Sequence, residues 1–106
     1  MNEVMAAQMT VVEDALAADV QAAGADPWDN TLAYTYDDGV FHGYLYAVPD
    51  GMGIEFDKNS YLWDAENPIY SRYVMCGHGT RVEERLLAEN WQELVSTEDL
   101  VVYKRS

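Results

Sequence analysis

The residues that could perform chemistry in this sequence are mainly carboxylates. Close pairs such as Asp37 and Asp38 have the composition of acid–base or calcium-binding groups. However, 19 acids among 106 residues produce close pairs by chance, and no EF-hand calcium-loop pattern is present. Cys76 and His78 lie two positions apart, but two ligands do not complete a zinc site. We therefore expect no metal, no cofactor and no enzymatic activity.

Other catalytic motifs are absent from the sequence. It contains no phosphate-binding loop, GxSxG elbow, HExxH zinc motif or CxxC pair. The backbone N–H groups of residues 77–80 could face an anion next to Arg81, but a flexible entry into a helix is the simpler interpretation. The lone Cys76 cannot form an internal disulfide, so we expect a small buried side chain and a cytoplasmic protein.

Charge is the strongest signal in the sequence. Six Lys and Arg residues oppose 19 Asp and Glu residues, which gives a formal net charge of −13. Residues 1–57 contain 11 of the acids and no Lys or Arg. A surface this negative repels nucleic-acid phosphates and anionic membranes, so we expect neither as a direct partner. Ordinary domains intersperse both signs of charge, and the imbalance therefore requires an explanation.

Hydrophobic periodicity predicts two helices. The first has its N-cap at Asn2, or starts at Val11 if Thr10 and Glu13 form a capping box, and Gly24 follows its end. Its apolar stripe consists of Met5, Met9, Val12, Leu16, Val20 and Ala23. The second helix begins at the capping box of residues 80–83. Its predicted buried side consists of Val82, Leu86, Leu87, Trp91, Leu94 and Val95.

Strand patterns occupy much of the remaining sequence. Alternation predicts strands over 31–36, 52–56, 69–75 and 100–103, and Asp38-Gly39 is a two-residue hairpin signal. We predict one α+β domain over residues 1–106. Its sheet is expected to be an antiparallel β-meander of about four to five strands, with two helices packed on one face.

In size, acidity and lack of catalytic motifs, residues 1–57 resemble the small acidic inhibitors of phages and mobile elements, the anti-CRISPR and anti-restriction DNA mimics. This resemblance implies a protein that occupies the basic nucleic-acid-binding surface of a host defence complex. Its partner would be a CRISPR effector, a restriction enzyme or a nuclease toxin, and it would act in the host cytoplasm as a monomer or homodimer. Acids about 5–6 Å apart on a helix can imitate neighbouring phosphates.

The predicted partner contacts are acids of the loops and hairpin, an acidic helical flank that we expect to be solvated, and three aromatic anchors. They are Asp26, Asp29, Asp37, Asp38, Asp50, Glu55, Asp57, Glu13, Asp14, Asp19, Tyr44, Tyr46 and Trp28.

Three other interpretations remain open. An immunity protein or antitoxin would neutralise a basic nuclease toxin by the same electrostatics. General acidity, as in salt-adapted organisms, would require no specific partner. An enzyme is the weakest interpretation, because active sites are assembled in space and need no motif.

Overall fold

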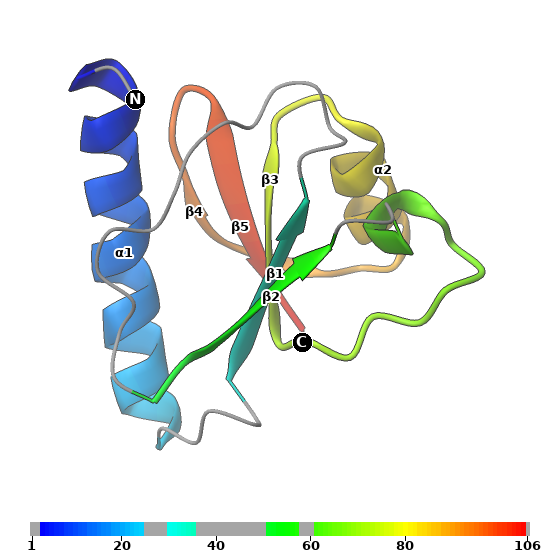
Figure 1. Ribbon diagram of the computed structural model, residues 1–106, viewed down its shortest axis with the longest axis horizontal. Coiled ribbons are helices and arrows are strands. Elements are labelled where there is room, and N and C mark those ends of the chain that lie inside the picture. The colour runs from blue at the N-terminus through cyan, green and yellow to red at the C-terminus, as the bar shows by residue number, and fades with distance from the viewer. Residues whose placement is uncertain (1–2, 25–29, 36–50, 58–60, 106) are drawn as a thin grey trace.

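The computed structural model describes residues 3–24, 30–35, 51–57 and 61–105. Two α-helices, α1 (Glu3–Ala23) and α2 (Arg81–Ala88), flank a five-stranded sheet (Figure 1). Along the chain the strands are β1 (Thr31–Thr35), β2 (Gly53–Asp57), β3 (Tyr73–Gly77), β4 (Gln92–Ser96) and β5 (Leu100–Lys104). The 3-10 turn η1 (Tyr61–Trp63) lies between β2 and β3. The predicted α+β class is therefore confirmed.

The sheet is mixed, and the prediction of an antiparallel meander is wrong. Its strand order is β2-β1-β3-β5-β4. Strand β1 pairs in parallel with both β2 and β3, whereas β5 pairs antiparallel with β3 and β4. Alternation of side chains identifies a strand but carries no information about the direction of its neighbour. The hairpin predicted at Asp38-Gly39 lies outside the described residues.

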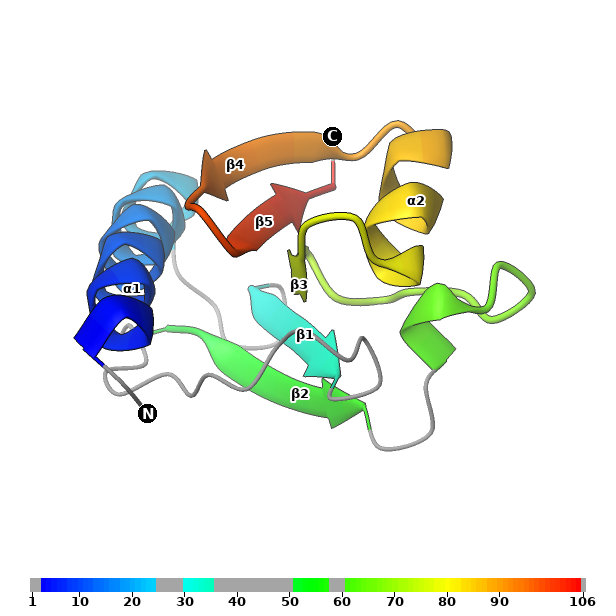
Figure 2. The ribbon, with the colours of Figure 1, turned by 90° about the horizontal axis from the view of Figure 1, so that it is seen from above.

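The two helices cover opposite faces of the sheet, not one face as predicted (Figure 2). Met9, Val12, Leu16 and Val20 of α1 pack against one side of the strands. Val82 and Leu86 of α2 belong to the cluster on the other side. All five residues of β3 are buried, because a central strand covered on both faces is apolar at every position. The continuous apolar runs of β3 and β5 are the sequence signal of a sheet that is covered by a helix on each face.

The first helix ends as predicted. Four residues of its predicted apolar stripe are buried, whereas Met5 is half-buried and Ala23 is exposed. Gly24 follows its last turn with a φ of 78°, a left-handed conformation that suits glycine. The alternative start at Val11 is wrong, because the capping residue that it requires, Thr10, lies inside the helix. Its hydroxyl donates to the Ala6 carbonyl one turn earlier.

The second helix is shorter than predicted. Its start at the Thr80 cap is confirmed, but it ends at Ala88, and Asn90 then adopts a φ of 62°. The chain turns there and continues as strand β4. Leu87, predicted to be buried, is 56% exposed, whereas Trp91 and Leu86 enter the core. Apolar residues at positions 91, 94 and 95 fit either a helix or a strand, and the turn decides between them.

Candidate functional site

Eight of the thirteen predicted contact residues lie outside the described residues. They are Asp26, Trp28, Asp29, Asp37, Asp38, Tyr44, Tyr46 and Asp50. Of the other five, Glu55 and Asp14 are exposed, on β2 and α1 respectively, and Asp57 is the last residue of β2. Glu13 and Asp19 are half-buried on α1. The five predicted acids that the structure describes therefore lie on two elements, three on α1 and two on β2.

Asp19 is a structural residue, and the expectation that it is solvated is wrong. One carboxylate oxygen accepts a 2.7 Å hydrogen bond from the Tyr73 hydroxyl, and the other accepts a 3.0 Å bond from Lys104 Nζ. Desolvation works to raise the pKa of Asp19, but these two hydrogen bonds and the charges of Lys104 and Arg72 lower it below its ordinary value. Asp19 thereby ties the end of α1 to strands β3 and β5.

Two arginines fasten the segment between η1 and β3. Arg85 is buried, and its guanidinium donates to the carbonyls of Leu62 and Asn67 as well as to Glu89. Arg105 donates to the carbonyls of Ile69 and Ser71. Each guanidinium supplies several donors in one plane, so a single side chain can satisfy several carbonyls of an irregular loop.

The described cations also contact aromatic rings and a carboxylate of the same chain. Arg105 lies over the ring of Trp91 at 4.5 Å, Arg81 over Trp63 at 4.2 Å, and Arg72 over Tyr73 at 5.6 Å. Lys104 forms the ion pair with Asp19. The described Lys and Arg side chains therefore contact rings, carbonyls and two carboxylates of the same chain, Asp19 and Glu89. Four exposed acids, on α1, α2, β4 and the β4–β5 turn, form no ion pair among the described residues. They are Asp14, Glu84, Glu93 and Glu98.

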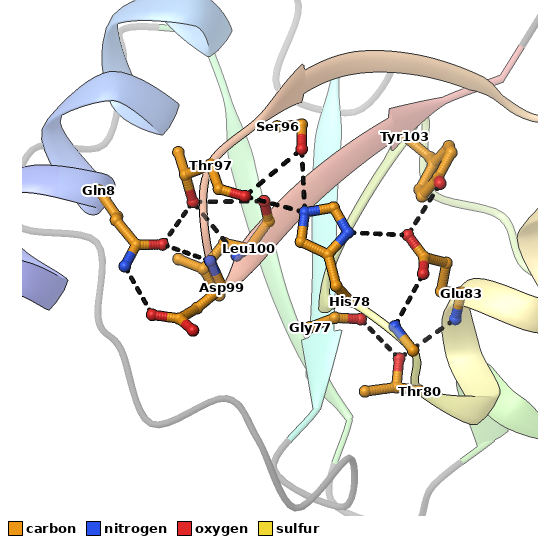
Figure 3. Close-up of polar contacts among 11 residues, drawn as sticks. Gln8, Gly77, His78, Thr80, Glu83, Ser96, Thr97, Asp99, Leu100 and Tyr103 are labelled. Atoms are coloured by element: carbon orange, nitrogen blue, oxygen red, sulfur yellow. Dashed lines mark hydrogen bonds and ion pairs between the residues drawn. The ribbon is translucent and has the colours of Figure 1, made fainter.

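A polar cluster at one end of the sheet joins three elements (Figure 3). The Glu83 carboxylate accepts hydrogen bonds from the Gly79 N–H at 2.8 Å and the Tyr103 hydroxyl at 3.0 Å, and lies 3.3 Å from His78 Nδ1. Thr80 Oγ1 accepts from the Glu83 N–H, which is one half of the predicted capping box, whereas the Glu83 carboxylate binds the N–H of Gly79, the residue before the cap. Because the Glu83 carboxylate binds the Gly79 N–H, this amide does not serve an external anion.

In this cluster the pKa values of Glu83 and Tyr103 are shifted. Desolvation would raise the pKa of Glu83, but the hydrogen bonds from Gly79, Tyr103 and His78 and the charge of His78 hold it below its ordinary value. Burial, followed by the hydrogen bond to Glu83, raises the pKa of Tyr103 well above that of a free tyrosine. The cluster therefore favours an ionised Glu83 and a neutral Tyr103.

Ser96, His78 and Glu83 lie in the order of a nucleophile, a base and an orienting carboxylate, but one contact opposes that chemistry. His78 Nε2 is 2.9 Å from the Ser96 hydroxyl and also 2.9 Å from the Thr97 carbonyl (Figure 3). A carbonyl oxygen only accepts, so a hydrogen bond from Nε2 to Thr97 requires the tautomer of His78 that carries a proton on Nε2. A general base for Ser96 would need that nitrogen unprotonated. The arrangement thus fastens the β4–β5 turn to the loop before α2.

The same turn is tied to α1 from its other side. Gln8 is buried, and its side-chain carbonyl accepts hydrogen bonds from the Thr97 hydroxyl and the Asp99 N–H, while its amide donates to Asp99 at 2.7 Å. Sequence reasoning missed this contact because the partners lie about 90 residues apart. The capping box could signal Glu83, but no local pattern marks Gln8.

The described part of the chain contains neither a cluster of possible metal ligands nor a helix that could span a membrane. No group of three His, Cys, Asp or Glu side chains there could hold a metal ion, and Cys76 is buried in the core rather than paired with His78. None of the helices described is long and apolar enough to cross a membrane.

Comparison with known proteins adds no relative. No protein-family model, curated protein or solved structure matches this chain.

Proposed function

We propose that this protein binds the positively charged, nucleic-acid-binding surface of a partner protein and blocks it. The observation that supports this proposal is that the described cations contact groups of the protein itself. A net charge of −13 accompanies cations that, among the described residues, contact the protein's own rings, carbonyls and internal acids. Exposed carboxylates therefore remain available to a basic partner, and their field would accelerate association.

The average charge density of this protein shows how closely its acids must gather to resemble DNA. Dividing the 5842 Å² accessible surface by 13 net charges gives about 450 Å² per charge. Duplex DNA carries about one charge per 100 Å² if it is treated as a cylinder roughly 20 Å wide. A DNA-like contact therefore needs local concentration of acids. We propose that the acids of residues 1–57, in particular Asp37 and Asp38, supply this local concentration.

The experiment is a pull-down from host lysate with the protein immobilised, eluted either with salt or with duplex DNA. If the proposal is right, the retained protein is released by both, because DNA competes for the same basic surface. Retention that withstands excess DNA would contradict it. Recovery of a CRISPR or restriction subunit indicates a defence inhibitor, whereas recovery of a cognate nuclease toxin indicates an immunity protein.

Charge reversal then locates the contact. Asp37→Lys with Asp38→Lys should slow association with the captured partner at low salt while leaving the unfolding midpoint nearly unchanged. The matched control reverses Glu93 and Glu98, two exposed acids outside the predicted contact. Equal slowing by both pairs would show that only the net charge matters. A requirement for molar salt merely to fold would instead support general salt adaptation.

A further inference from the structure

A cleft of about 460 Å³ lies between η1 and α2. Trp63 and Ala65 line one side, and α2 contributes Arg81, Glu84 and Ala88 at successive turns of the other. The two alanines leave the space between the larger side chains open. A volume of this size lies within the range of sites that hold a small molecule or a side chain of a partner.

The walls of this cleft are held in place by internal contacts. Arg85 binds the carbonyls of Leu62 and Asn67 before and after the Trp63 wall, and thereby fixes η1 to α2. Arg81 lies 4.2 Å from the centre of the Trp63 ring, which holds both side chains against each other. The cleft is therefore built before any ligand binds, which lowers the cost of binding.

The charges of the residues that line the cleft balance, and the negative charge of the whole chain favours a cation. Arg85 is neutralised by its 2.8 Å ion pair with Glu89, and the Arg81 guanidinium is stacked on Trp63. Glu84 is exposed and forms no ion pair among the described residues, so its carboxylate is available to an incoming group. The net charge of −13 adds a long-range attraction for cations and repels anions.

We propose that this cleft receives an arginine side chain of the partner. The aliphatic stem would pack between Ala65 and Ala88 beside Trp63, and the guanidinium would reach the Glu84 carboxylate. An amphipathic side chain of this kind suits a mainly apolar cleft with carboxylates among its lining residues. The inference rests on the proposed function, because a basic nucleic-acid-binding surface is where such arginines are exposed.

The test is an NMR titration of the full chain with Nα-acetyl-arginine amide, followed at the indole N–H of Trp63. The signal is assigned with Trp63→Phe, since the chain contains three tryptophans. We expect a saturable shift with the arginine probe and none with the neutral, isosteric citrulline amide. The lysine amide should bind more weakly, because an ammonium group cannot make a bidentate contact with a carboxylate. No shift with arginine, or an equal shift with citrulline, would overturn the proposal.

Two variants separate the cleft from general acidity. Glu84→Gln should weaken the arginine probe about two- to fivefold, whereas the control Glu93→Gln, at an exposed position on β4, should not. Ala88→Phe fills the cleft from an exposed helix position and should abolish the saturable shift. Equal weakening by both glutamine variants would refute a specific cleft. A partner released by DNA but unaffected by Ala88→Phe would refute the cleft while leaving the proposed function intact.

Discussion

Arg85 should be among the most costly residues to replace on α2. Its side chain is 5% exposed, its Nε donates to Glu89 at 2.8 Å, and its terminal nitrogens donate to the carbonyls of Leu62 and Asn67. Arg85→Met keeps most of the aliphatic volume but removes every donor. One hydrogen bond from a charged group contributes about 1.5–3 kcal/mol, and a buried carbonyl left without a donor incurs a desolvation penalty of about 1–3 kcal/mol.

The two contributions describe partly the same lost contacts, so they do not add in full, and packing by the methionine side chain offsets part of the loss. We therefore expect Arg85→Met to lower the free energy of unfolding by about 3–4 kcal/mol. For a chain of this size the melting temperature should fall by more than about 10 °C. The assay is urea unfolding followed by circular dichroism, with the slope of free energy against urea checked for constancy.

The matched control is Arg81→Met on the same helix. Arg81 is exposed and stacks on Trp63, so its loss should cost no more than about 1 kcal/mol. If the two variants lose equal stability, the carbonyl contacts of Arg85 do not hold the segment between η1 and β3, and the reasoning is refuted.

Two further predictions concern local contacts. Thr80→Ala should cost about 0.5–2 kcal/mol, because the buried Thr80 hydroxyl caps α2 and also donates to Gly77 at 2.8 Å, whereas Thr10→Ala in the middle of α1 should be close to neutral. The lowered pKa of Asp19 means that the folded state binds its proton less tightly than the unfolded state, so its contribution is present above about pH 4 and is lost as the pH falls through the folded pKa. Asp19→Asn should therefore be less stable than wild type by about 1–2 kcal/mol at pH 7, and this difference should shrink toward pH 3.

Thermal unfolding of each variant checks both predictions, with Asp14→Asn as the exposed-acid control for the pH series. A loss of stability from Thr10→Ala that equals the loss from Thr80→Ala would contradict the capping account. An Asp19→Asn difference that stays constant from pH 7 to pH 3 would show that the carboxylate charge contributes nothing. Relief of repulsion on acidification affects both aspartate variants in the same direction, so the comparison removes it.

Local features of this protein were predictable because their causes are local. The stripe of α1, its end at Gly24 and the start of α2 at Thr80 each depend on residues within a few positions of one another. The length of α2 was not predictable, because residues 91–95 satisfy both a helical and a strand pattern. The turn with Asn90 at positive φ decides in favour of β4.

The sequence by itself determined the class of the fold, the end of α1, the start of α2 and a strong negative charge. Only the tertiary structure decided the parallel pairing of β1, the opposite placement of the helices, and which charges are consumed internally. Asp19 and Asp14 look alike in the sequence, yet Lys104 lies against only the former in the structure, 85 residues away along the chain. Strand partners and ion pairs are contacts between distant segments, and no local pattern records which segments will meet.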